Sequence, residues 1–198
     1  MTQPAQGTLF AHTFDGAPSA GAMRAAAVLL AAALTALAAQ FTVTLPFTAV
    51  PFTLQPTVVL LTALALGPRL GAAAQVTYLL AGLAGLPVWA NSPLLAPGAA
   101  RLLGPTAGYL WAYPAAAYLT GWLAARGWDR RYATSVLAMT VGLLVIFLSG
   151  VSWLTVVIGQ APAAALAAGF VPFFFLDLAK VGLAGMILPQ AWRLLGRR

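Results

Sequence analysis

The chain has 198 residues, of which 62% are hydrophobic and only 7% charged, whereas about 25% of the residues in a soluble domain are charged. Its net charge of +7 comes from basic residues scattered singly between apolar runs, so the excess indicates membrane topology rather than nucleic-acid binding. The chain has no cysteine, which excludes a disulfide framework, thiolate metal sites and a cysteine nucleophile. These features predict an all-α integral membrane protein with about six spans in a single domain, residues 22–198.

Residues 1–21 form a polar segment that contains His12, the only histidine. The segment lacks the positive n-region of a signal peptide, so we expect it to be a retained and flexible tail. The first span is expected over residues 22–40. Small residues recur four apart in it, including Ala27 and Ala31, and would let another helix approach closely, either within this bundle or from a partner subunit.

Residues 41–57, FTVTLPFTAVPFTLQPT, interrupt the apolar helical pattern with Pro46, Pro51 and Pro56. Each proline removes a backbone donor and favours extended geometry in the residue before it, so no helix can run through this segment. Irregular backbone is not tolerated against lipid, and the Phe, Val and Leu side chains do not suit a bare surface loop. We therefore expect an ordered, non-helical loop that is buried in protein or lines a cavity.

Five further spans are expected over residues 57–66, 72–86, 105–125, 133–158 and 171–192. With a cytoplasmic N-terminus, this count leaves only Arg101 in an outer loop and puts Lys180 within the last span. Eight arginines then fall on the inner side: Arg24, Arg69, Arg126, Arg130, Arg131, Arg193, Arg197 and Arg198. This is the positive-inside bias, and it predicts that both termini are cytoplasmic.

Asp177 and Lys180 are charged residues within the last expected span. They lie three residues apart, and so on one helix face, near the outer end. Charged groups in a span are functional candidates, although a structural ion pair would look the same. Lys180 could bind a ligand carboxylate, and Asp177 could accept hydrogen bonds from ligand N–H groups.

Other polar and aromatic residues are expected near the same outer end, where they could complete a pocket for a small, anionic, amide-like molecule: Gln55, Asn91, Tyr109, Phe47, Phe52 and Trp89. The first three would add donors and acceptors, and the last three would cover an apolar body. Trp89 and Tyr109 could instead belong to an interfacial aromatic belt.

The sequence lacks the motifs of several enzyme classes. It has no phosphate-binding G-x-x-x-x-G-K-[ST], no cluster of metal ligands and no possible Ser-His-Asp set, since its single histidine lies in the tail. We therefore expect a binding or transport protein with no catalytic residues, no metal and no cofactor. The alternatives are a solitary carrier or channel for a small anionic solute, and an intramembrane enzyme that uses Asp177.

Four motifs resemble one known family. They are VPFTLQP (50–56), LGPRLGAAAQVTYLLAGLAGLPVWA (66–90), GPTAGYL (104–110) and VPFFFLDLAK (171–180). They are similar to the BioY family, the biotin-specific substrate-binding (S) subunits of energy-coupling-factor (ECF) transporters. The resemblance implies a six-helix subunit of a prokaryotic plasma membrane that captures biotin outside and works with a transmembrane coupling subunit and two ATPases.

The same resemblance implies roles for individual residues. It makes Asp177 and Lys180 ligand contacts, places Gln55 near the pocket, and makes the first outer loop a lid. It also implies that small residues of the first helix, here Ala27 and Ala31, dock onto the coupling subunit. The loop from Asn91 to Gly104 departs from the expected Gly-rich form because it contains Pro93, Pro97 and Arg101. Arg101 is then either a second cation for the carboxylate or a surface charge.

Overall fold

The computed structural model describes residues 7–14, 19–48, 50–91 and 98–195, so Pro93, Pro97, Arg197 and Arg198 lie outside the described residues. The described chain forms the helices α1 (Leu9–Phe14), α2 (Ala20–Gln40), α3 (Gln55–Leu66), α4 (Pro68–Leu83), α5 (Ala107–Ala124), α6 (Tyr132–Val156), α7 (Pro162–Gly169), α8 (Val171–Ala184) and α9 (Ile187–Leu195). Shorter elements are the strands β1 (Thr42–Val43) and β2 (Phe52–Thr53) and the 3-10 helices η1 (Gly98–Leu103) and η2 (Trp128–Arg130).

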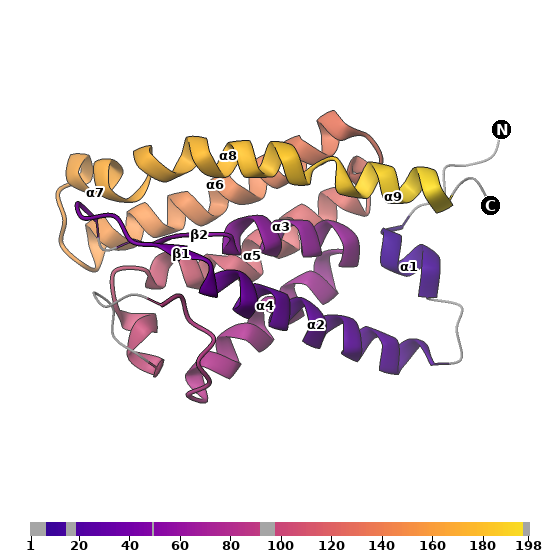
Figure 1. Cartoon of the computed structure of the whole chain (residues 1–198), viewed down its shortest axis with the longest axis horizontal. Helices are drawn as coiled ribbons and strands as arrows, with labels where there is room; N and C mark the ends of the chain where they lie inside the picture. The colour runs from indigo at the N-terminus through magenta and orange to yellow at the C-terminus, as the bar shows by residue number, and fades with distance from the viewer. Residues whose placement is uncertain (1–6, 15–18, 49, 92–97, 196–198) are drawn as a thin grey trace.

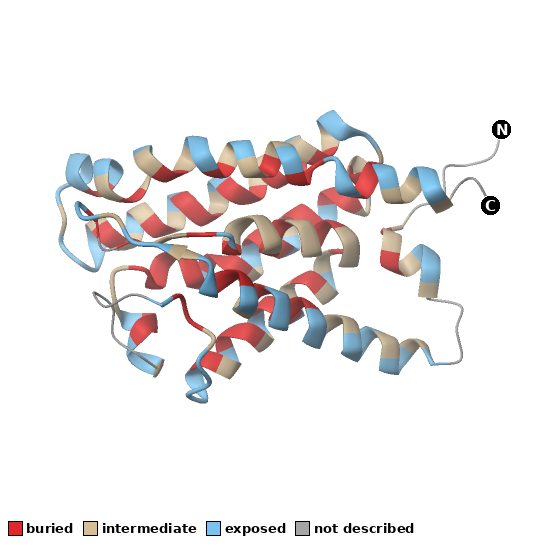
Figure 2. Ribbon diagram, viewed as in Figure 1, coloured by how far each residue is buried: buried red, intermediate tan, exposed pale blue. Residues whose placement is uncertain are grey.

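The long helices lie side by side along the long axis of the molecule, as Figure 1 shows. Helix α5 lies among α3, α4 and α6 and contacts all three. Buried residues concentrate on α5, α6 and the inward faces of the other helices, while much of α2 and α8 is exposed (Figure 2). The bundle has two distinct ends. One carries the β1–β2 hairpin and α7, and we call it the lid end; the other carries α1 and α9, and we call it the α9 end.

Three stretches of the described chain are long and apolar enough to cross a membrane: Ala20–Gln40, Tyr132–Val156 and Pro162–Leu195. They confirm the prediction of an all-helical membrane protein and match the first, fifth and last expected spans. Helix α3 is shorter, with 12 residues or about 18 Å. Helix α5 has 18 residues, and its sequence includes Tyr, Trp, Gly and Pro114. Helix α5 can carry these residues because most of its side chains are buried within the protein.

The segment 41–57 is non-helical up to Leu54, as expected. Strands β1 and β2 pair in antiparallel fashion, with Thr42 opposite Thr53 and Val43 opposite Phe52. Helix α3 begins at Gln55, two residues before the expected start, because Pro56 falls in its first turn, where a missing N–H loses no helical hydrogen bond.

The break between α3 and α4 is narrower than the sequence suggested. Gly67 alone ends α3, with φ at 85°, and Pro68 starts α4 four residues earlier than expected. This junction packs tightly on α5, because a Cβ atom on Gly121 would lie 2.4 Å from the carbonyl carbon of Gly67. Gly121 therefore lets the α5 backbone touch the α3–α4 junction directly.

Within the N-terminal segment, residues 9–14 form α1 and bury Phe10. At the same end, the indole Nε1 of Trp192 in α9 donates to Oδ2 of Asp129 at 2.6 Å. The Arg130 guanidinium lies 4.7 Å from the Trp192 ring, and the His12 ring meets the edge of that ring at 5.2 Å. Helix α1 contacts α3, and its His12 lies against Trp192 of α9, while the flexibility of the N-terminal segment stays a prediction.

Candidate binding site

The lid, which we define as residues 41–54, lies across the lid end of the bundle. The hydroxyl of Thr48 donates to the carbonyl of Ala168 at 2.7 Å, which ties the lid to the end of α7. Farther along the lid, the Phe52 ring stacks on Phe173 of α8 at 6.3 Å between centroids. Two separate points of the lid are therefore attached to the last helical stretch of the chain.

A cavity of about 50 Å³ lies beneath the lid. Its walls come from the lid, α3, α5, α6, α8 and the segment between α4 and α5. They include the polar side chains of Gln55, Arg101 and Asp177 and the rings of Phe52, Trp89, Tyr109, Tyr113, Phe147 and Phe173. An apolar, aromatic cavity with a few convergent polar groups is typical of small-molecule sites.

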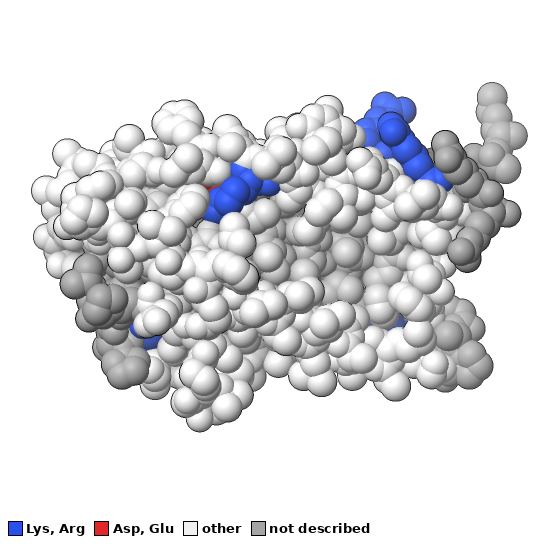
Figure 3. Space-filling model, viewed as in Figure 1, with Lys and Arg blue, Asp and Glu red and all other residues white. Residues whose placement is uncertain are grey.

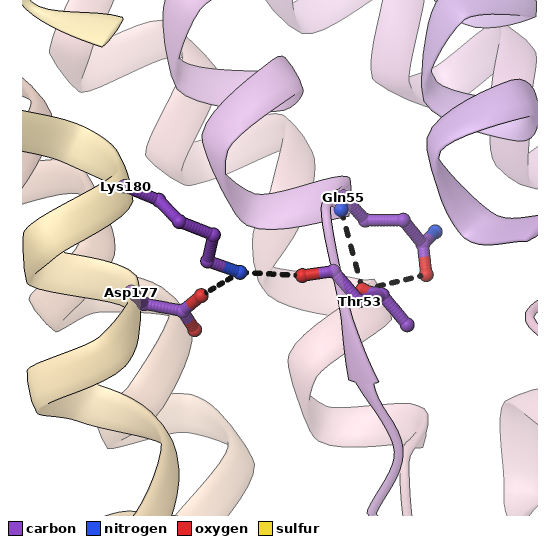
Figure 4. A network of polar contacts seen from close by, with 4 residues as sticks. All are labelled: Thr53, Gln55, Asp177 and Lys180. Carbon is purple, nitrogen blue, oxygen red and sulfur yellow. Dashed lines mark hydrogen bonds and ion pairs between the residues drawn. The ribbon is translucent and has the colours of Figure 1, made fainter. Parts of the chain in front are cut away.

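Asp177 and Lys180 form an ion pair on one face of α8, as the spacing predicted. Figure 4 shows Lys180 reaching from α8 to the lid, where its ammonium donates to the carbonyl of Thr53 at 2.6 Å. The ammonium also lies 4.0 Å from the centroid of the Phe52 ring. Asp177 is only 3% exposed and lines the cavity, whereas Lys180 is half-buried and is not among the described residues that line it.

Arg101 in η1 brings a second charge to the cavity wall. Its side chain is buried at 5% exposure, and its Nη1 donates to the carbonyl of Ala90 at 3.0 Å. Burial lowers the pKa of the guanidinium, and the electrostatic influence of Tyr78 opposes this effect. An arginine nevertheless stays protonated in proteins, so Arg101 presents a positive charge to the cavity. The burial of Arg101 contradicts the interpretation of this residue as a surface charge.

Gln55 belongs to a chain of polar contacts at the start of α3. Its amide nitrogen donates to the Tyr78 hydroxyl at 2.7 Å, and Tyr78 donates to the carbonyl of Val88 at 3.2 Å. Figure 4 shows the Thr53 hydroxyl beside Gln55, where it accepts from the Gln55 backbone at 3.2 Å. Neither Tyr78 nor Thr53 was predicted as a site residue from the sequence. For Tyr78, the only indication in the sequence was a hydroxyl within the apolar pattern of α4.

Tyr109 and Trp89 are buried and line the cavity, so neither is an exposed interfacial belt residue. The Tyr109 hydroxyl donates to the carbonyl of Gly169 at 2.8 Å, and the Trp89 indole donates to the carbonyl of Gly98 at 2.9 Å. Each side chain thus anchors a neighbouring segment while its ring faces the cavity.

Two other residues that were predicted to line the pocket, Phe47 and Asn91, are not among the described residues of the cavity wall. Phe47 belongs to the lid, but its side chain is 63% exposed and is absent from the described cavity wall. Asn91 is exposed and immediately precedes residues outside the described part of the chain. Among the described residues, no group of three His, Cys, Asp or Glu is placed to hold a metal ion.

The two alanines predicted at a partner interface lie in different environments. Ala31 is 2% exposed and buried within this chain, where α2 packs against α3 and α4. Ala27 is partly exposed, and the next large residues along α2, Leu29 and Leu30, are exposed. Ala27 and Ala31 share one helix face, of which Ala27 is the more accessible position, and docking of a partner there stays a prediction.

The family model described as BioY family matches residues 11–197. The probable biotin transporter BioY of Pyrococcus horikoshii is 40% identical over 134 residues, which cover 68% of this chain and 75% of that protein. The biotin transporter BioY of Thermotoga maritima is 38% identical over 145 residues, which cover 73% of this chain and 82% of that protein.

One solved structure shares the fold. It is the crystal structure at 2.1 Å of the S-component for biotin from an ECF-type ABC transporter. The two structures align with a TM-score of 0.77 and 20% sequence identity, over 89% of this chain and 94% of that chain. At this identity the likeness concerns the arrangement of the helices.

Proposed function

We propose that this chain, which belongs to the BioY family, is the biotin-binding S component of an ECF-type transporter. It is a membrane subunit that binds and delivers its ligand without chemical change. The observation that carries the proposal is the cavity under the lid, where a buried cation, a buried carboxylate and aromatic rings meet. Biotin offers a matching carboxylate, a ureido group and an apolar ring and chain.

The proposed topology has six crossings, formed by α2, α3, α4, α5, α6 and the stretch α7–α9. Both termini then lie in the cytoplasm, and the lid end faces outward. The support is the distribution of arginine in the sequence, which puts eight arginines on the predicted inner side and Arg101 alone in a predicted outer loop.

The cavity geometry favours Arg101 over Lys180 as the partner of the biotin carboxylate. Arg101 lines the cavity, and its planar guanidinium suits bidentate binding of a carboxylate. Asp177 lines it too and can accept the ureido N–H groups. Lys180 neutralises Asp177 and holds the lid through Thr53, which makes it a positioning residue. This assignment revises the expectation that Lys180 itself binds the carboxylate.

Ligand entry requires the lid to move. The cavity of about 50 Å³ has room for a few water molecules, whereas pockets for ligands of this size occupy roughly 300–1,000 Å³. The hydrogen bonds of Thr48 to Ala168 and of Lys180 to Thr53 are the described polar ties that must lengthen or break as the lid rises.

A cycle of two ligands and two variants tests the assignment. Removing one partner of a desolvated charge pair costs about 2–5 kcal/mol, or a 30-fold to several-thousand-fold loss of affinity. We expect Arg101→Ala to lose this much for biotin and far less for biotin amide, which lacks the carboxylate charge. Lys180→Ala should weaken acid and amide equally. Arg131→Ala, which changes an exposed arginine at the α9 end, is the control and should change neither.

One result of this cycle would contradict the assignment of Arg101 as the carboxylate partner. A loss at Lys180 that is selective for the acid, with none at Arg101, would return the carboxylate contact to Lys180. Absence of stoichiometric biotin binding by the wild-type protein would reject the proposed function itself.

The proposed partners are the transmembrane coupling subunit and two ATPase subunits, so we expect uptake to require ATP hydrolysis by that module. Biotin uptake by this chain in cells lacking the ATPases would instead support the alternative, a solitary carrier. Comparing uptake in the same cells with and without the module distinguishes the two.

A further inference from the structure

One aromatic residue of the cavity under the lid keeps its polar group unbonded. Of the described aromatic residues that line the cavity and carry a donor, Trp89 and Tyr109 donate to backbone carbonyls. Tyr113 of α5 is only 3% exposed, and its hydroxyl makes no hydrogen bond with any described residue. A buried tyrosine hydroxyl normally has a partner, because leaving it without one is unfavourable. The Tyr113 hydroxyl is therefore available to a ligand.

Packing holds the ring of Tyr113 in the cavity wall. Its centroid lies 6.4 Å from that of Tyr78, whose hydroxyl accepts from Gln55 and donates to the carbonyl of Val88. Tyr78 is itself 1% exposed, so Tyr113 packs against a ring that is fixed by two hydrogen bonds. A donor that is already held in place loses little freedom when a ligand binds.

Tyr113 and Asp177 lie at a similar depth in the bundle. Helices α5 and α8 both begin at the lid end and run toward the α9 end (Figure 1). Helix α5 starts at residue 107 and α8 at residue 171, so Tyr113 and Asp177 each lie about 9 Å along their helices. Both line the cavity, whereas Arg101 lies in η1, before α5 begins.

Other uncharged donors of the described cavity wall suit this depth less well. The Thr53 hydroxyl and the Gln55 amide nitrogen are engaged, with the Gln55 amide oxygen and the Tyr78 hydroxyl respectively. The Thr106 hydroxyl is buried without a partner, but Thr106 is the N-cap residue of α5. It lies about two turns nearer the lid end than Tyr113.

We propose that the Tyr113 hydroxyl donates to the carbonyl oxygen of the ligand's ureido group and determines specificity for that group. The inference rests on the proposed function, in which Asp177 accepts the ureido N–H groups. A ureido group combines N–H donors with a carbonyl acceptor, so its complete recognition needs an acceptor and a donor close together. Asp177 supplies the acceptor, and Tyr113 supplies the donor.

Titration of two ligands against two proteins tests this contact. Tyr113→Phe removes the hydroxyl and keeps the ring, so the buried ureido oxygen of biotin loses its donor. Binding of biotin should weaken roughly 5- to 150-fold. The thiourea analogue of biotin keeps both N–H groups but has sulfur, a weak acceptor, in place of the ureido oxygen. Its affinity should therefore change far less in Tyr113→Phe.

Two matched variants separate ligand recognition from packing. Tyr118→Phe makes the same change at an exposed residue of α5 outside the described cavity wall, and both ligands should bind as they do to the wild type. Tyr109→Phe breaks the bond to Gly169 and should weaken both ligands by the same factor. Without ligand, Tyr113→Phe should melt no lower than the wild type, because its hydroxyl has no partner in the protein, whereas Tyr109→Phe should melt lower.

Infrared spectroscopy of biotin labelled with carbon-13 at the ureido carbon observes the same contact directly. A hydrogen bond lowers the stretching frequency of a carbonyl, so the band of bound biotin should move to higher frequency in Tyr113→Phe. It should keep its wild-type position in Tyr118→Phe. An unmoved band in Tyr113→Phe would contradict the contact.

The titrations can also overturn the inference. Equal weakening of biotin and its thiourea analogue in Tyr113→Phe would make the hydroxyl a structural group. A smaller loss for biotin amide than for biotin would assign Tyr113 to the carboxylate, and a loss selective for the ureido oxygen in Thr106→Val instead would move the contact to Thr106. Each of these results leaves biotin binding by the wild type intact, whereas its absence would reject the proposed function itself.

Discussion

The two ends of the bundle hold charge in opposite ways. At the lid end, Arg101 and Asp177 are at most 5% exposed and line one cavity under an ordered cover. At the α9 end basic side chains gather at the surface, as Figure 3 shows, and Asp129 is the buried exception. Burying a charge is unfavourable unless it is paired, whereas an exposed arginine needs only water or lipid headgroups. Charges of both signs are therefore buried together only at the proposed ligand site, among the described residues, whereas the arginines at the α9 end support the proposed topology.

The largest effect expected from this comparison concerns the two buried acids. Asp177→Asn keeps the shape of the side chain but leaves Lys180 without its counter-ion and the ligand N–H groups with a weaker acceptor. We expect biotin affinity to fall by about 30-fold or more, since a buried charge pair is broken. Asp129→Asn makes the same chemical change at the other end and should leave affinity unchanged. Equal titration curves for Asp177→Asn and the wild type would contradict the proposed site.

Next in size is an effect on transport without an effect on binding. Ala27→Leu enlarges a partly exposed position of α2 and should prevent close approach of the coupling subunit. Uptake should be lost while biotin binds normally. Ala31→Leu is a poorer test because Ala31 is buried in this chain. Co-purification of Ala27→Leu with the coupling subunit at wild-type yield would show that the docking face lies elsewhere.

A smaller effect is expected in the lid. Thr48→Val removes the hydroxyl that binds the carbonyl of Ala168 and keeps the shape of the side chain. A net loss of about 0.5–1.5 kcal/mol predicts biotin dissociation roughly 2–12 times faster. Thr77→Val removes a similar hydroxyl that bonds within α4, to Ala73, and serves as the control. Stopped-flow release rates that are equal in the two variants would argue against Thr48 as a tie of the lid.

The smallest effect concerns stability at the α9 end. Burial raises the pKa of Asp129, and the hydrogen bond from Trp192 opposes this only in part. Between the ordinary and the raised pKa the folded state binds more protons, so the free energy of unfolding falls as pH rises through this window. Asp129→Asn should remove this dependence and raise the melting temperature near neutral pH.

Thermal unfolding at pH 3.5 and 7.5 measures this difference. The gain of Asp129→Asn over the wild type should be present at the higher pH and shrink at the lower one. A gain of equal size at both values would mean that the titration of Asp129 plays no part.

The sequence could predict the elements that depend on local chemistry. The prolines predicted the non-helical lid, and the apolar runs predicted α2 and α6. The spacing of Asp177 and Lys180 predicted that the two residues share a helix face, where they form an ion pair. It could not predict which cation faces the cavity, because that depends on how η1 folds back beneath Trp89 and Ala90. Nor could it place Tyr78, whose partner Gln55 is 23 residues away on another helix.

Helix α3 links the two ends of the molecule through its backbone alone. It begins at Gln55 on the wall of the lid cavity and ends at Leu66, and the next residue, Gly67, lies against Gly121 of α5. Two backbones meet at this junction with no side chain between them, so a side chain at Gly121 would push α3 away from α5 and shift Gln55 on the cavity wall.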